Sequence, residues 1–183
     1  MPYPSDLLVE EHKLIERMLV VLDNIADLLQ KGQSVPAEVL EKAVDFIRNF
    51  ADKYHHGKEE DILFKLMEKR GIPVEGGPIG AMLHEHNMGR SFVSALADAA
   101  DRLEDGDDSA RNIVIENIRN FTELLSNHIH KENNILYPMG NQIFSPEDQN
   151  YLQQEFEQFN QSKGQDVHDR YSQVVQELEA TYK

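Results

Sequence analysis

The sequence has 183 residues, a formal net charge of −15, 40% hydrophobic and 28% charged residues, and no cysteine. This composition is typical of a single folded domain that buries a real core. The negative charge argues against nucleic acid or an anionic membrane as a partner, because both would repel an acidic surface. The absence of cysteine excludes disulfides, thiolate metal sites, iron–sulfur ligation and cysteine nucleophiles, so any metal must be held by nitrogen and oxygen.

The N-terminal residues Met1 to Asp6 lack the basic and apolar regions of a signal peptide. No apolar run in the sequence reaches the length that spans a membrane. We therefore expect no contact with a membrane and a cytoplasmic location.

Four long helices are predicted in chain order. The first runs from Ser5 to about Lys31, where Gly32 ends it, and the second opens near Pro36 and ends at Gly71. A Gly/Pro-rich link over 71–78 leads to the third, which lasts until the acidic turn at 104–108, and the fourth follows as far as Pro138. Each carries apolar residues at steps of three and four, the pattern of a helix that buries one face in a bundle.

After Pro138 the sequence predicts a short irregular stretch and then a helix start at Ser145-Pro146-Glu147-Asp148. One or two further helices are expected, over about 146–162 and 166–182. We predict a four-helix bundle of two helical hairpins over residues 1–138 and a C-terminal helical extension over 139–183, packed on or beside it. The extension is interpreted as a packing or partner-binding element that could also form a homo-oligomer; no protein partner is identified by its sequence.

Two matching stretches carry the chemistry. His55-x-x-x-Glu59 and His128-x-x-x-Glu132 are each followed by x-x-Ile-Leu-aromatic, and a second Glu-His pair stands upstream of each. Corresponding residues recur at an interval of 73 to 74 residues. A histidine and a glutamate four residues apart share one helix face, so both can point to one metal ion. The predicted metal ligands are four histidines and two glutamates from the two copies: His12, His55, Glu59, His86, His128 and Glu132.

The apolar stripes of the helices indicate which of two neighbouring His–Glu pairs faces the core and can bind a metal ion. His55 and Glu59 continue the apolar stripe of the second helix, whereas His56 and Glu60 continue a polar line. The sequence therefore predicts that His55→Ala loses metal and that His56→Ala largely keeps it. The remaining histidines lie off the stripes and are expected to be exposed: His84, His130 and His168. Carboxylates next to the predicted ligands are candidates to orient the imidazoles: Glu11, Glu60 and Glu85.

A bundle core that buried six such groups without partners would lose several kcal/mol for each unpaired charge. A network of hydrogen-bonded His and Glu side chains is the structural alternative; a metal site is the simpler interpretation. Carboxylates and imidazoles without thiolate suit iron, manganese or zinc. The ferritin-like class uses Glu-x-x-His, and no glutamate stands three residues before any of the eight histidines, so that class is disfavoured.

The pattern of these residues over about 5–138 resembles the hemerythrin-like (HHE cation-binding) domain. The resemblance implies an all-α, up-down-up-down four-helix bundle around two non-haem iron ions with an oxo or hydroxo bridge; zinc or manganese could replace the iron. Carried over by motif, the first iron would be held by His12 and His55 and the second by His86 and His128. Glu59 and Glu132 would bridge them.

The sequence differs from oxygen-carrying hemerythrins in two places. Those proteins have His-x-x-x-His in the third helix, where Met82 stands four residues before His86. They also have an aspartate five residues after the last histidine, whereas Glu132 follows His128 by four. The chain is more similar to hemerythrin-like sensor proteins, repair proteins and peroxide-handling proteins. We therefore expect that it binds or senses a small oxidant: dioxygen, peroxide or nitric oxide. A di-iron enzyme, acting in peroxide decomposition or iron–sulfur repair, and a structural or iron-storage bundle stay open as alternatives.

Overall fold

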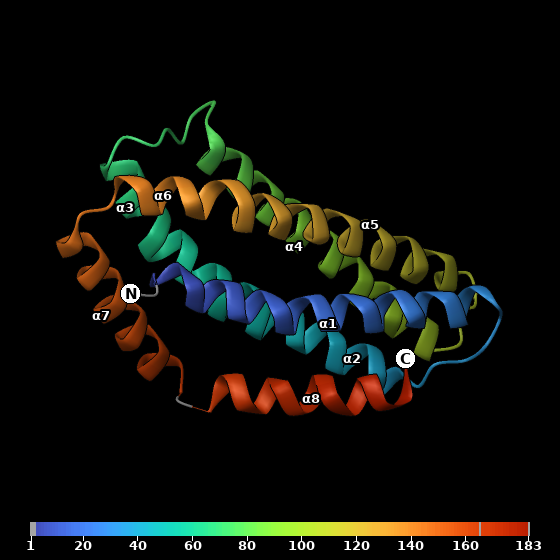
Figure 1. The fold of residues 1–183 in the computed structure, drawn as a ribbon. Coiled ribbons are helices and arrows are strands. Elements are labelled where there is room, and N and C mark those ends of the chain that lie inside the picture. The colour runs from blue at the N-terminus through green and yellow to red at the C-terminus, as the bar shows by residue number, and fades with distance from the viewer. Residues whose placement is uncertain (1–2, 165, 183) are drawn as a thin grey trace.

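The predicted helices lie side by side as a four-helix bundle in the computed structural model, which describes residues 3–164 and 166–182 (Figure 1). Positions 1, 2, 165 and 183 of the predicted domains lie outside the described residues. The bundle consists of α1 (Ser5–Gln30), α2 (Ala37–Phe46), η1 (Ile47–His56), η2 (Glu59–Leu63), α3 (Phe64–Lys69), α4 (Pro78–Glu104), α5 (Ala110–Lys131), η3 (Glu132–Leu136) and α6 (Tyr137–Ile143). α2 to α3 form one long helix, and α5 to α6 form another.

The ends of the first two long helices are where the sequence predicts them. Gly32 follows α1 with φ of 76°, and Gly71 follows α3 with φ of 98°. These are backbone conformations that glycine adopts without the steric cost of a Cβ atom. The chain can therefore reverse direction at both points, and the predicted up-down-up-down order is confirmed (Figure 1).

Three segments of these helices are π-helical. η1 occupies the middle of the second long helix, and η2 and η3 begin at Glu59 and Glu132, which are equivalent positions of the two sequence copies. A π-helix makes hydrogen bonds from i to i+5, so its turn is wider than that of an α-helix, and it is frequent at functional sites. The wider turn changes which side chains face the core.

The fourth long helix does not end at Pro138. The sequence predicts an irregular stretch there, but α6 continues to Ile143. Pro138 lies in the first turn of α6, directly after η3, so its missing backbone N–H falls where the π-helical hydrogen-bond pattern changes to the α-helical one. The predicted helix at Ser145 is confirmed: the Ser145 hydroxyl accepts from the backbone N–H of Asp148, and the Asp148 carboxylate accepts from that of Ser145.

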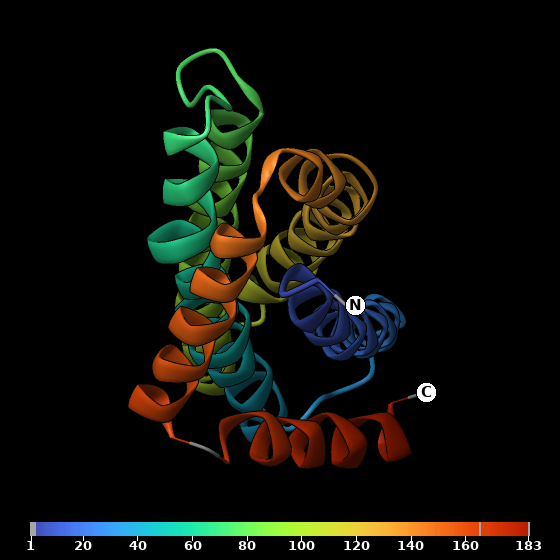
Figure 2. The same ribbon diagram turned by 60° about the vertical axis from the view of Figure 1, so that its left-hand side comes forward.

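The C-terminal extension forms two helices, α7 (Pro146–Lys163) and α8 (Val167–Thr181), as predicted. α7 packs beside η2, and α8 lies across α1 and α2 on the outside of the bundle (Figure 2). Ion pairs tie each helix to the bundle: Arg70 to Asp148 at 2.6 Å, and Arg17 to Glu179 at 2.6 Å.

The apolar core is divided into two clusters with polar residues between them. On α1, Leu8 belongs to one cluster and Leu14 to the other, and His12 stands between them. The other three long helices repeat this order, with one cluster on each side of their predicted ligands. The histidines and glutamates therefore occupy a layer that apolar side chains seal from both ends of the bundle.

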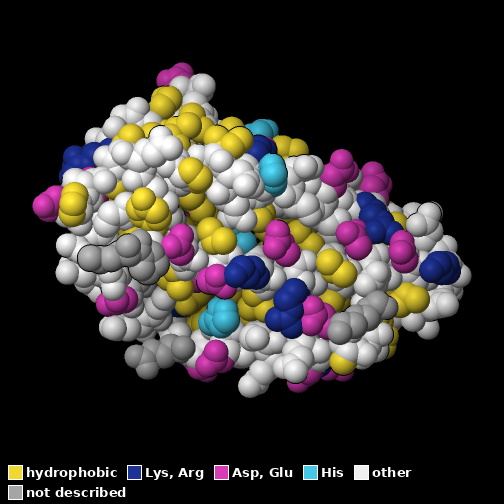
Figure 3. Space-filling view, in the orientation of Figure 1, with side chains coloured by type: hydrophobic (Ala, Val, Ile, Leu, Met, Phe, Trp, Pro, Cys, Tyr) yellow, Lys and Arg dark blue, Asp and Glu magenta, His cyan; other side chains and the backbone are white. Residues whose placement is uncertain are grey.

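On the face shown in Figure 3, Lys and Arg side chains are interspersed with Asp and Glu and form no separate basic patch. This agrees with the excess of acidic residues in the sequence. Among the described residues, no helix combines the length and the apolar character that crossing a membrane requires.

Candidate metal centre

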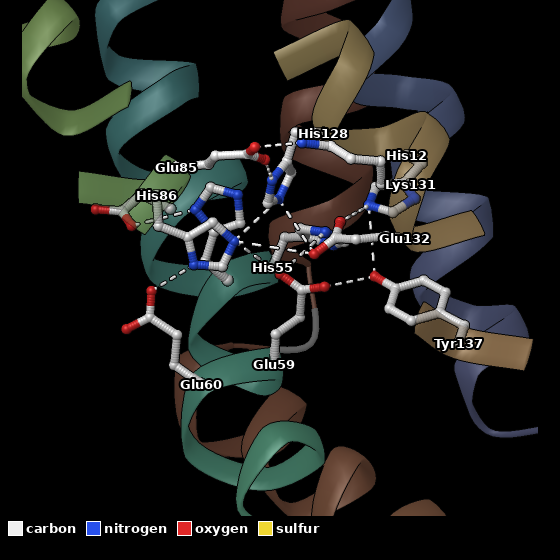
Figure 4. A network of polar contacts seen from close by, with 12 residues as sticks. His12, His55, Glu59, Glu60, Glu85, His86, His128, Lys131, Glu132 and Tyr137 are labelled. Carbon is white, nitrogen blue, oxygen red and sulfur yellow. Dashed lines mark hydrogen bonds and ion pairs between the residues drawn. The ribbon is translucent and has the colours of Figure 1, made fainter. Parts of the chain in front are cut away.

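All six predicted ligands are buried, and their side chains converge from the four long helices (Figure 4). Two donor groups form, in each of which the ligand atoms lie within 4.8 Å of one another. The first donor group consists of His12, His55, Glu59 and Glu132. The second donor group consists of His56, Glu59, His86 and His128. The groups pair the histidines as the resemblance implies, and they share Glu59.

His56 is the donor that the sequence did not predict. The prediction that it faces solvent is wrong, because its side chain is buried and its ring stacks on that of His86 with centroids 3.8 Å apart. The error comes from η1, whose wider turn moves His56 off the polar line extrapolated from α2. Its neighbour Glu60 is only partly buried, near the polar line where it was predicted. The centre thus offers five imidazoles rather than four.

The prediction that three further histidines are exposed is confirmed. His84, His130 and His168 are all exposed. They take no part in either donor group.

Each donor imidazole is oriented by a hydrogen bond at Nδ1. The Nδ1 atom of His55 lies 2.9 Å from Glu11 Oε2, and that of His128 lies 2.8 Å from Glu85 Oε2. These are equivalent pairs in the two copies: the glutamate before one histidine binds the histidine of the next helix. Two of the three candidate carboxylates, Glu11 and Glu85, are therefore confirmed as hydrogen-bond partners of the imidazoles.

The remaining three rings follow the same pattern. His86 Nδ1 is 2.6 Å from Glu60 Oε1, and His12 Nδ1 is 2.8 Å from the amide oxygen of Asn133. His56 Nδ1 makes a longer contact of 3.4 Å with Asp52. Because every Nδ1 atom faces an oxygen acceptor, the proton of a neutral ring belongs on Nδ1. Each Nε2 atom is then left with a lone pair, which is the form that binds a metal ion.

The Nε2 atoms and the carboxylate oxygens of the centre point toward one another, and several of them have no hydrogen-bond donor. His86 Nε2 and His128 Nε2 are 3.0 Å apart, and His12 Nε2 is 3.3 Å from Glu132 Oε2. Four buried atoms of the centre have no hydrogen-bond partner in the described structure: His55 Nε2, Glu59 Oε2 and both carboxylate oxygens of Glu132. Buried polar atoms are almost always paired, so these positions fit a cation held between them.

Burial and charge set the protonation of the ligands. Burial lowers the pKa of His55 and of His56 well below the usual value, which keeps both rings neutral. Burial and the carboxylate of Glu132 raise the pKa of Glu59, whereas the neighbouring His128 outweighs burial and lowers the pKa of Glu132. For His128, burial acts to lower the pKa, but Glu132 leads the groups that raise it overall.

Two lysines extend the orienting network outward. Lys58 Nζ forms an ion pair with Glu11, and Lys131 Nζ forms one with Glu85. Each lysine stands directly before one of the two donor glutamates, Glu59 or Glu132. The repeat of His-x-x-Lys-Glu in the two copies is the sequence signal that marks the lysines. The two copies differ in burial: the Lys58 side chain is 0% exposed and the Lys131 side chain 37%.

One hydroxyl group also reaches the centre. Tyr137 is buried, and its Oη atom donates to Glu59 Oε1 at 2.5 Å (Figure 4). Its ring stacks on that of His12 with centroids 5.7 Å apart. The equivalent residue of the first copy is Phe64, which has no hydroxyl, so the two halves of the centre are chemically different.

The chain is similar in sequence to several known proteins. An uncharacterized protein of Mycobacterium tuberculosis, Rv1995, is 23% identical over 181 residues, which cover 96% of this chain and 69% of the relative. The iron-sulfur cluster repair protein YtfE of Dickeya chrysanthemi is 31% identical over 86 residues, 46% of this chain and 39% of that protein. YtfE of Musicola paradisiaca is 33% identical over the same length.

No solved structure gives a significant match. The family model of the hemerythrin HHE cation binding domain matches residues 3–140, which contain all seven donor residues. The chain therefore belongs to the hemerythrin HHE cation-binding family.

Proposed function

We propose that this chain binds two iron ions, one in each donor group, and that the pair reacts with a small oxidant: dioxygen, peroxide or nitric oxide. The observation that carries the proposal is the set of unpartnered, buried Nε2 and carboxylate atoms at the centre. Imidazoles together with two carboxylates suit iron. Iron held by such ligands supplies one-electron redox chemistry and open positions for a small ligand.

The residues of the chain hold, orient and enclose the site. Glu59 belongs to both donor groups, so it is the carboxylate that would bridge two ions. Glu132 lies 3.1 Å from His128 Nε2 as well as 3.3 Å from His12 Nε2, so it also reaches across both halves. The apolar clusters on both sides shield the site from water at the two ends of the bundle.

The test is to load the metal-free protein with ferrous iron under anaerobic conditions and to add dioxygen, hydrogen peroxide or nitric oxide separately. We expect a change of the optical spectrum with at least one of the three. Iron that stays spectroscopically silent toward all of them would contradict the proposed reaction and leave a structural or storage site.

A second candidate is a role in iron–sulfur cluster repair, which the local similarity to the two YtfE proteins favours. It predicts that the iron-loaded protein restores activity to an iron–sulfur enzyme damaged by peroxide. Free ferrous iron at the same concentration is the control, and equal recovery in that control would count against repair.

A further inference from the structure

A cavity of about 180 Å³ lies between η1, α4 and α5, directly beside the second donor group. His56 and His86 form part of its wall, so it reaches the imidazole rings of the centre. Most of the remaining lining is apolar and includes Val93, Phe121 and Leu125, which are themselves buried. The cavity thus joins an apolar space to the place where a metal ion would bind.

The volume exceeds what a diatomic molecule or hydrogen peroxide needs. An apolar protein cavity of about 150 Å³ stays free of water and binds benzene. The present cavity is of similar size, but it is partly open, and charged side chains join the apolar ones in its lining: Arg48, Asp52, Glu85 and Arg90. It can therefore take a ligand with an apolar body of about the size of a benzene ring.

Gly89 contributes to this volume. It lies in the middle of α4 and lines the cavity. A Cβ atom added there would lie 3.6 Å from Phe121 and 3.9 Å from Leu124, which are ordinary contacts, so packing does not require a glycine. Glycine inside a helix is destabilising relative to alanine. The structural effect of this glycine is to leave the cavity open.

The rim of the cavity is polar, and ion pairs join its side chains. The Arg90 guanidinium binds Asp52 Oδ1 at 2.7 Å and Glu60 Oε1 at 2.6 Å. Those carboxylates are the partners of the donor rings His56 and His86. Arg90 therefore fixes the wall of the cavity and the two imidazoles as one unit, so a ligand in the cavity meets the donor group in a defined orientation.

We propose that this cavity binds an organic hydroperoxide with a small apolar body and directs its peroxide group toward His56 and His86. The inference rests on the proposed function and names the class of oxidant. Reduction of the hydroperoxide takes two electrons, one from each of two ferrous ions, and two protons from solvent. The O–O bond breaks, and an alcohol and water form.

The first experiment tests the cavity without metal. Benzene is added to the metal-free protein, and its melting temperature is measured. We expect a rise of about 3 °C, because a ligand that binds only the folded state stabilises it. Val93→Phe, which fills the cavity, should abolish the rise, and Val20→Phe, at a position that is 59% exposed, should retain it. No rise in the wild-type protein would overturn the proposal.

The second experiment tests the reaction. The protein loaded with ferrous iron is mixed with cumene hydroperoxide or hydrogen peroxide, and the rate of iron oxidation is followed. We expect Val93→Phe to slow oxidation by cumene hydroperoxide about tenfold and to change the rate with hydrogen peroxide less than about twofold. An equal effect on both peroxides, or none on either, would overturn the selective role of the cavity.

Gly89→Ala is the second variant, in case Val93→Phe fails to fold; its added methyl group meets only ordinary contacts. It should reduce both the benzene effect and the cumene hydroperoxide rate by an intermediate amount. Failure of the proposed function has a different signature. If neither peroxide oxidises the iron while benzene still raises the melting temperature, the redox chemistry and the hydroperoxide assignment are wrong, and the cavity binds only the apolar molecule.

Discussion

The two Lys–Glu ion pairs of the repeat differ in burial, so Lys→Met should lower the free energy of unfolding by different amounts at the two positions. Lys58 and Glu11 are almost completely buried, and Lys58 Nζ also binds Asn160 at 3.2 Å and lies 3.7 Å from the centre of the Tyr54 ring. Lys58→Met removes the cation and leaves the Glu11 carboxylate buried. Breaking a buried ion pair by removing one partner costs about 3–5 kcal/mol.

The matched control is Lys131→Met. Lys131 binds Glu85 in the equivalent position of the second copy, but its side chain is 37% exposed. Water can solvate the carboxylate that remains, so we expect a loss of about 0–1 kcal/mol. The Met side chain fills a similar volume in both variants and is a good helix former, which leaves burial as the main difference between the two sites.

The measurement is urea unfolding of the metal-free protein at pH 7, followed by circular dichroism. It is made on the wild type, on the four single variants Lys58→Met, Glu11→Gln, Lys131→Met and Glu85→Gln, and on the double variant of each pair. The double-mutant cycles should give a coupling of several kcal/mol for the buried pair. The coupling for the exposed pair should stay below about 1 kcal/mol. Equal coupling in the two copies would refute the reasoning from burial.

Three further predictions concern the extension and the centre. Arg70 lowers the pKa of Asp148 to about 2, so the stability that their pair contributes is present above about pH 4 and is lost as the pH falls toward 2; urea unfolding should show the difference between wild type and Asp148→Asn shrink over this range. Leu152→Ala, at a fully buried position of α7, should cost about 2–5 kcal/mol in the same assay, whereas Tyr151→Ala, at an exposed position, should cost less than about 0.5 kcal/mol; similar losses would contradict the docking of α7. Tyr137→Phe removes the hydroxyl donor of a shared carboxylate and should weaken iron binding about 10- to 100-fold in competition with a chelator; unchanged affinity would show that this hydrogen bond does not support the site.

The sequence predicts most of the fold because its apolar residues follow the period of an α-helix over long stretches. The stripe of the second helix leads correctly through Leu40 to His55 and Glu59, all of which are buried. The error in the orientation of His56 lies within a π-helical segment. His56 in η1 turns inward instead of outward. An α-helical period cannot anticipate a local change of the hydrogen-bond pattern.

The orienting contacts are predictable only where the repeat displays them. Glu11 in the first copy and Glu85 in the second stand at equivalent positions, each directly before a histidine. Their role in orienting imidazoles could therefore be inferred from the repeat. Asn133 and Tyr137 occur in the second copy alone, where no second occurrence marks them. Their contacts with His12 depend on how α1 packs against η3 and α6, which is a property of the folded chain rather than of a local pattern.

The most direct test of the metal centre is the number of iron ions that each chain retains after anaerobic loading and removal of unbound metal. The wild-type protein should hold about two. His56→Ala should hold less iron in the second donor group, contrary to the expectation from the sequence, and His84→Ala, at an exposed position outside both groups, should match the wild type. One ion or none in the wild type would contradict the assignment of two metal positions, and full retention by His56→Ala would contradict the role of the fifth imidazole.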